Sequence, residues 1–111
     1  MADYETHEHD VLVIGAGGAG LRAAIEASAA GVSVGLVCKS LLGKAHTVMA
    51  EGGLAAALGH VDPQDGWEVH FRDTMKGGSF LSHWRMAQLH AQESPDRARE
   101  LEQWEIGRAH V

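Results

Sequence analysis

The chain has 111 residues, a formal net charge of −6 and one cysteine, Cys38. This length allows one small domain, and the 45% hydrophobic and 22% charged residues are close to globular averages. The acidic balance without a basic cluster excludes nucleic-acid binding, and the single cysteine excludes an internal disulfide and fits a reducing compartment.

The sequence pattern also argues against membrane insertion. The longest uncharged run, Ala27–Cys38, has 12 residues, whereas a membrane-spanning helix needs about 20. The acidic start, Met1–Glu5, does not resemble a signal peptide. We therefore expect a cytoplasmic protein without direct membrane insertion.

The first predicted element is a short buried strand over the four apolar residues Val11–Ile14. It leads into three glycines with the spacing G-x-G-x-x-G. Gly15 permits a tight turn, Gly17 lets the backbone approach a pyrophosphate, and Gly20 lets the next helix lie close to the strand. Phosphates then sit at a helix N-terminus, where unpaired N–H groups favour negative charge. The predicted nucleotide-binding turn consists of Gly15, Ala16, Gly17, Gly18, Ala19 and Gly20.

A helix and a second strand complete a predicted βαβ unit. The alanine-rich stretch Leu21–Ala30 is a good helix pattern, and Gly31 is expected to end it. Val32–Val37 is the predicted second strand, parallel to the first. The Asp or Glu that usually holds the ribose hydroxyls at this point is replaced by Cys38–Ser40. Either the ribose is held in another way or Lys39 faces a phosphate, which disfavours an ordinary NAD dehydrogenase but not a nucleotide.

A polar loop, Lys39–Gly53, follows and carries two lysines, a histidine and a Gly-Gly pair. After a βαβ unit such a loop can cover a bound dinucleotide, and the paired glycines let the backbone approach a flat group. Lys44 is equally well interpreted as a solvated loop charge. Glu51 either hydrogen-bonds a ribose or caps a short helix over Gly52–Leu58, and we favour the first interpretation.

The second half of the chain is predicted to be mostly helical. Asp65 and Glu68 have the spacing of a capping box that begins one helix, and Gly77–Gly78 ends it. His83–Glu93 forms the next helix. Ser94–Pro95 then begins a third, with Ser as the N-cap and Pro at the first helical position.

Three motifs narrow the class of protein. They are V-I-G-A-G-G-A-G-L-R-A-A at Val13–Ala24, H-T-V-x-A-E-G-G at His46–Gly53 and D-T-x-x-G-G at Asp73–Gly78. With these motifs the sequence resembles, over Asp10–Trp104, the flavoprotein subunits of the succinate dehydrogenase and fumarate reductase family. The resemblance implies an α/β fold, in which a Rossmann-like FAD-binding βαβ unit followed by helices forms an incomplete part of a larger FAD-binding domain.

The resemblance also implies where FAD lies. Its pyrophosphate sits on the first glycine-rich turn, and its isoalloxazine lies near the second. In that family the histidine at the position of His46 is joined covalently to the flavin methyl carbon, which raises the reduction potential and helps FAD accept hydride from succinate. Relatives of the L-aspartate oxidase type lack this histidine. The remaining candidate cofactor residues are Cys38, Lys39, Ser40, Ala45, Thr47, Glu51, Gly52 and Gly53.

Most of the eight histidines are expected to be exposed or hydrogen-bonded without a chemical role. His7 and His9 lack a third close ligand, so no metal site is predicted. His46 differs because the family motif surrounds it on both sides.

We therefore expect the FAD-binding N-terminal part of a flavoprotein that transfers hydride between succinate or fumarate and FAD. The resemblance implies an iron–sulfur subunit that passes electrons to quinone, and membrane-anchor subunits that hold the complex at the inner face of the cell membrane. The alternatives are an inert or stand-alone nucleotide-binding fragment and an FAD oxidoreductase of the L-aspartate oxidase type. No residue matches the family's substrate-binding groups, so no catalytic residue is assigned and the chain alone is expected to be inactive.

The end of the chain departs from the family pattern. The family's flavoproteins are several times longer, and the seven residues Glu105–Val111 resemble a translated sequencing adapter. We expect residues 1–104 to be the N-terminal part of an FAD-binding domain and residues 105–111 to be a non-native tail.

Overall fold

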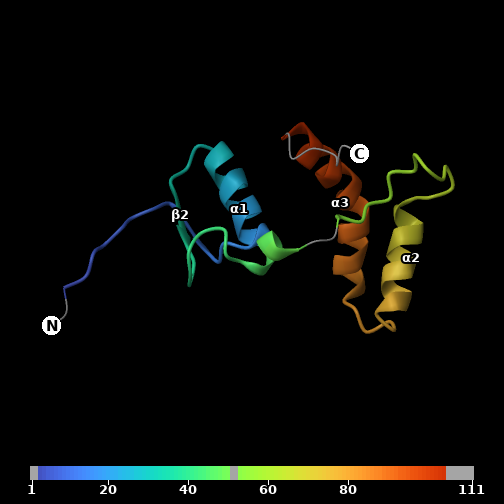
Figure 1. Ribbon diagram of the computed structural model, residues 1–111, viewed down its shortest axis with the longest axis horizontal. Coiled ribbons are helices and arrows are strands. Elements are labelled where there is room, and N and C mark those ends of the chain that lie inside the picture. Colours follow the sequence, from blue (N-terminus) through green and yellow to red (C-terminus); the bar gives the residue numbers. More distant parts are fainter. Residues whose placement is uncertain (1–2, 51–52, 105–111) are drawn as a thin grey trace. The chain divides into compact units, whose positions relative to one another are not determined.

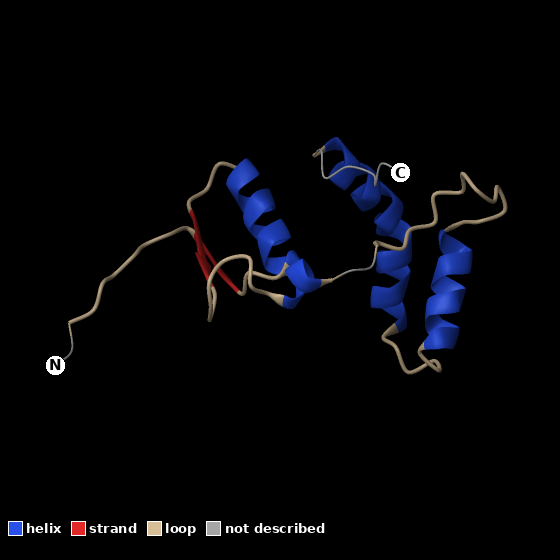
Figure 2. Ribbon diagram, in the orientation of Figure 1, coloured by secondary structure: helices blue, strands red, loops and turns tan. Residues whose placement is uncertain are grey.

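A computed structural model describes residues 3–50 and 53–104 of the chain (Figure 1). The chain divides into two compact units, Met1–Gly52 and Gly53–Val111. Within the described residues, the first unit holds a parallel strand pair with one α-helix, and the second holds two α-helices (Figure 2). The predicted α/β class, a βαβ unit followed by helices, is confirmed.

The βαβ unit consists of β1 (Val11–Ile14), α1 (Gly18–Ala29) and β2 (Val34–Val37). The strands are parallel, with Val11 opposite Val34. β2 begins two residues after its predicted start because the N–H of Ser33 donates to the Asp10 carboxylate at 2.9 Å and not to a backbone carbonyl.

The helix α1 begins at Gly18, three residues before the predicted Leu21, and Gly17 is its N-cap. The first intrahelical bond runs from the Leu21 N–H to the Gly17 carbonyl at 2.9 Å. The last glycine of the motif therefore lies in the first turn of the helix. Gly31 follows the C-cap with φ of 85°, as predicted for a glycine that ends a helix.

One face of the strand pair is apolar and open. Leu12, Ile14 and Val37 are 59%, 82% and 51% exposed, and the alternation of side chains along a strand places them away from α1. Parallel sheets normally bury both faces and have apolar residues on both. This face is therefore typical of a strand pair that belongs to a larger sheet.

The second unit is a helical hairpin of α2 (Trp67–Gly77) and α3 (Trp84–Gln103), which lie side by side (Figure 1). The buried residues of α3 are small, Ala87, Ala91 and Ser94, and they recur on one helix face. Small side chains at these positions let α2 approach closely. The predicted end of the first helix at Gly77–Gly78 is confirmed, with Gly78 as the C-cap.

Two local predictions about the start of this unit are wrong. The predicted capping box does not form, because Gly66 is the N-cap of α2 and the Asp65 carboxylate accepts the adjacent Gly66 N–H at 3.0 Å. The predicted helix over Gly52–Leu58 does not form either in its described part, residues 53–58, which is irregular. A helix this short is marginal without tertiary packing.

The predicted break at Ser94–Pro95 is also wrong, since α3 is one helix of 20 residues with Pro95 inside it. Ser94 is only 4% exposed and Ala91 is fully buried. The Ser94 hydroxyl donates to the carbonyl of His90 within the helix and so does not cap a new one. Burial of this face within the second unit outweighs the hydrogen bond that proline cannot make.

We expect Pro95→Ala to raise the free energy of unfolding by about 1–2 kcal/mol. Alanine restores the N–H opposite the Ala91 carbonyl, worth up to about 3 kcal/mol, and loses about 1 kcal/mol through a more flexible unfolded chain. Urea unfolding followed by circular dichroism measures the change. Gln92→Ala, on the exposed side of α3, is the control and should change stability by less than about 0.5 kcal/mol. Equal or lower stability of Pro95→Ala would contradict this account of α3.

No helix within residues 3–50 and 53–104 combines the length and the apolar character needed to cross a lipid bilayer.

Candidate functional site

The turn between β1 and α1 depends on two glycines for its shape. Gly15 has φ of 110°, a conformation that favours glycine, and its N–H donates to the Val37 carbonyl at 2.7 Å. A Cβ on Gly20 would lie 1.8 Å from the Gly15 carbonyl oxygen, so no side chain fits there. The predicted roles of Gly15 in the turn and of Gly20 in close helix–strand packing are confirmed.

Gly17 lies in the same turn but has a different environment. Its backbone is extended, with φ of −78° and ψ of −174°, which any residue adopts. A Cβ would meet only Thr47 Oγ1 at 3.8 Å and Ala45 Cβ at 4.0 Å, which are ordinary contact distances. Packing within the protein therefore does not require glycine here, whereas the close approach of a ligand to the backbone would.

A pocket of about 540 Å³ opens beside this turn, at the carboxyl ends of the two parallel strands. This edge is where ligands bind in open parallel sheets. The pocket brings together eight of the predicted site residues from three segments of the first unit, Gly15, Ala16, Gly17, Cys38, Lys39, Ser40, Ala45 and His46.

The electrostatics of the pocket favour an anionic ligand. Its lining includes the exposed side chains of Lys39 and Lys44 and contains no carboxylate. The N-terminus of α1 adds the partial positive charge of a helix start. The Cys38 thiol donates to the Ser40 carbonyl at 2.8 Å, so it stabilises the turn after β2 where a ribose-binding acid is usually found.

The other predicted site residues lie elsewhere. Gly18, Ala19 and Gly20 form the first turn of α1, next to the pocket but outside its lining. Thr47 also lies outside the lining, and Gly53 belongs to the second unit. Glu51 and Gly52 fall outside the residues that the structure describes.

The sequence did not predict three apolar residues of the lining, Ile14, Val37 and Leu41. It also did not decide whether Lys44, which lines the pocket, is a site residue or a solvated loop charge. Ile14 and Val37 are the last residues of β1 and β2. Their positions carry a usable signal, because the final residues of parallel strands border the ligand crevice.

His46 reaches the pocket from a short helical turn. The turn η1 (His46–Met49) is a 3₁₀ helix within the loop that follows β2. His46 is exposed and lines the pocket. The next side chain, Thr47, accepts a hydrogen bond from the Gly18 N–H at 3.0 Å, so it connects η1 to the start of α1.

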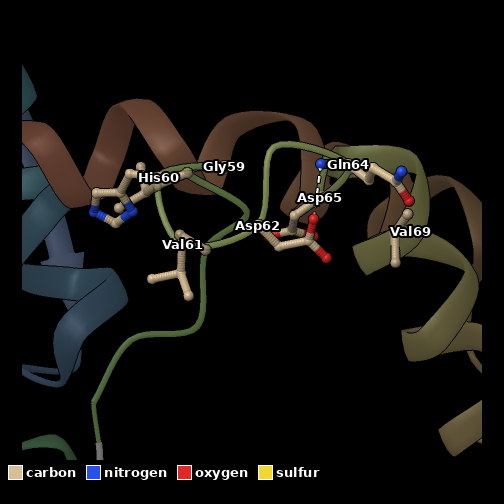
Figure 3. A pocket seen from close by; sticks show the side chains of 9 residues that line it. Gly59, His60, Val61, Asp62, Gln64, Asp65 and Val69 are labelled. Atoms are coloured by element: carbon tan, nitrogen blue, oxygen red, sulfur yellow. Dashed lines mark hydrogen bonds between the residues drawn. The ribbon is translucent and has the colours of Figure 1, made fainter.

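The second unit has a separate pocket of about 390 Å³ before α2 (Figure 3). Its carboxylates already have backbone partners, since Asp62 accepts the Gln64 N–H at 2.9 Å and Asp65 accepts the Gly66 N–H. Among the described residues, no group of three or more His, Cys, Asp or Glu side chains is placed to hold a metal ion. We therefore assign no chemistry to this second pocket.

Comparisons with known proteins agree with this geometry. Residues 10–110 match the family model described as FAD binding domain. The chain is 50% identical over 101 residues to one subunit of the fumarate reductase (CoM/CoB) of Methanothermobacter marburgensis, a match that covers 90% of this chain and 18% of that protein. It is 42% identical over 98 residues to a mitochondrial succinate dehydrogenase (ubiquinone) flavoprotein subunit of Xenopus laevis, covering 88% and 15%.

A solved structure gives the same result. A chain in the structure of Mycobacterium smegmatis Sdh1 in complex with UQ1 superposes with a TM-score of 0.83 and 66% identity, over 88% of this chain and 16% of that one. The present chain thus spans 15–18% of the length of these relatives. The chain belongs to the FAD-binding domain family, and it corresponds to a small part of the flavoprotein subunits of succinate dehydrogenase and fumarate reductase.

Proposed function

We propose that this chain is the FAD-binding part of a longer flavoprotein that transfers hydride between succinate or fumarate and FAD. The proposal rests on the pocket beside the glycine turn, where Gly17 leaves room for a ligand at the backbone and Lys39 and Lys44 supply positive charge. The low coverage of the relatives and the open apolar face of the strand pair support a longer protein.

The residues present fit FAD in three parts. The backbone of Gly15–Gly17 and the N–H groups of Ala19 and Gly20 in the first turn of α1 would receive the pyrophosphate. Lys39 and Lys44 would offset its charge, and Ser40 would hold the ribose in place of the missing acid. When bound, FAD supplies a two-electron acceptor for hydride. The protein's own part is to bind and orient it beside Ala45 and His46.

His46 is proposed to carry FAD covalently. Its imidazole is exposed and lines the pocket, so it is accessible to a flavin bound there. This histidine also favours a respiratory complex over the L-aspartate oxidase type. In that complex an iron–sulfur subunit passes the electrons to quinone, and membrane-anchor subunits hold the flavoprotein at the inner face of the cell membrane. We also propose that Glu51 and Gly52–Gly53 contact the cofactor and that residues 105–111 are a non-native tail.

A chimera tests the function. Residues 10–104 replace the matching segment of the Mycobacterium smegmatis chain, whose 66% identity makes the new contacts compatible. We expect the purified chimera to hold stoichiometric FAD and to oxidise succinate. A folded chimera that lacks flavin would contradict the cofactor proposal. A chimera that binds FAD but acts on neither succinate nor fumarate would contradict the substrate proposal alone.

A further inference from the structure

The hydrogen bond between Thr47 and Gly18 joins two segments that are 29 residues apart in the chain. Gly18 is the first residue of α1, so its N–H has no partner within the helix. The Thr47 hydroxyl supplies that partner at 3.0 Å. His46 lines the pocket and Thr47 does not, so Thr47 is next in sequence to a lining residue but lies outside the lining.

The two residues are also sterically complementary. A Cβ on Gly18 would lie 3.3 Å from Thr47 Cγ2, which is a tight contact, and 3.4 Å from Thr47 Oγ1, which is at the limit of ordinary van der Waals contact. Position 18 is one of the variable positions of the G-x-G-x-x-G motif, so the motif itself does not require glycine there. A side chain at position 18 would therefore require Thr47 to shift by a few tenths of an ångström.

We propose that Thr47 is a positioning residue that fixes η1 through Gly18 and so holds His46 in the orientation needed for its bond to the flavin. The inference rests on the proposed FAD function and deepens it. The bond replaces one imidazole N–H and one methyl C–H by an N–C bond, and the two protons and two electrons pass to the isoalloxazine ring. The oxidised flavin is itself the oxidant, so the step needs no further one. The orientation of the His46 imidazole toward the methyl carbon then sets how fast the bond forms.

Three variants of the chimera separate positioning from binding. Thr47→Val keeps the shape of the side chain but removes the acceptor, and we expect covalent attachment to be about 10- to 100-fold slower because a small misalignment has effects of this size. Thr47→Ser keeps the hydroxyl and should attach FAD at nearly the unsubstituted rate. Val48→Ala, in the same turn and 65% exposed in the parent chain, is the control and should change nothing.

A compensating pair tests the steric part. Gly18→Ala pushes a methyl group against Thr47, and it should slow attachment. Adding Thr47→Ser removes Cγ2 while keeping the hydroxyl, so the double variant should recover part of the rate. Failure of Thr47→Ser to relieve Gly18→Ala would overturn the complementarity of the pair.

The measurements are in-gel fluorescence of denatured protein over time, for covalent FAD, and total flavin after proteolysis. Slower attachment with unchanged total FAD supports positioning. The positioning role would be overturned if Thr47→Val attached FAD as fast as the unsubstituted chimera. It would also be overturned if both Thr47 variants lost total FAD and covalent FAD to the same extent. An unsubstituted chimera without FAD would instead contradict the proposed function, and one with only releasable FAD would contradict the bond to His46.

A second measurement needs no flavin. In the 111-residue chain, amide hydrogen exchange at Gly18 should be faster in Thr47→Val than in the unsubstituted chain, because the N–H has lost its acceptor. Thr47→Ser should keep the protection. Identical exchange in all three chains would overturn the inference even if a variant of the chimera fails to fold.

Discussion

Gly17→Ala and Gly20→Ala are expected to abolish FAD retention in the chimera for different reasons. A Cβ at Gly20 would lie 1.8 Å from a backbone oxygen, so α1 must move away from β1, at a cost of about 3 kcal/mol or more. A Cβ at Gly17 meets its neighbours at 3.8 Å and beyond, so the fold should remain while the methyl group blocks the pyrophosphate. Gly17→Val should have the same effect as Gly17→Ala.

The two variants are distinguished by measuring flavin content and thermal stability together. Gly20→Ala should lose both flavin and thermal stability, whereas Gly17→Ala should lose flavin but keep a higher melting temperature than Gly20→Ala. Gly77→Ala is a matched control, because a Cβ there meets no atom within 4 Å and alanine suits the last turn of α2. Stoichiometric flavin in Gly17→Ala or Gly17→Val would remove the reason for assigning the pocket to FAD.

His46→Ser is expected to leave FAD bound but releasable by acid, with succinate oxidation reduced more severely than fumarate reduction. Loss of the covalent bond lowers the reduction potential of the flavin, which penalises accepting hydride and spares donating it. For a two-electron couple, a decrease of about 30 mV changes the equilibrium constant tenfold. The ratio of the two activities therefore reports even a modest change in potential.

The measurements for this variant are gel fluorescence, intact protein mass and both activity assays in the chimera. The unsubstituted chimera should show a fluorescent denatured band and a mass increased by one FAD, and His46→Ser should show neither. His60→Ser replaces an exposed histidine of the second unit and should behave like the unsubstituted protein. Covalent flavin in His46→Ser, or equal loss of both activities, would contradict the role of His46.

The βαβ unit was predictable because its signals are local. The apolar run Val11–Ile14 has the length and β-branched residues of a buried strand, and Gly15 supplies a φ that other residues rarely adopt. The close packing at Gly20 was predictable for the same reason, because the last glycine of the G-x-G-x-x-G spacing is where the helix packs against the strand. The exact helix start was not predictable, because it depends on how the turn closes over β2.

The second unit shows what local signals cannot decide. Ser94–Pro95 has the local properties of a helix start, yet α3 continues through it because Ala91 and Ser94 are buried within the second unit. The capping box failed in the same way, since Asp65 found a nearer backbone partner in Gly66. In both places packing and turn geometry chose between hydrogen bonds that the sequence permits equally.

The candidate site also contains residues that the sequence predicted and residues that only the structure revealed. By itself the sequence predicted the glycine turn, Lys39 after β2 and the histidine of the second motif as site residues, because spacing and residue type indicate their chemistry. Only the tertiary structure decided that Ile14 and Val37 complete the pocket and that Thr47 bonds to Gly18. Neither residue of that bond reveals its partner, since a contact between segments 29 residues apart exists only once β2 has paired with β1 and brought the following loop to the start of α1.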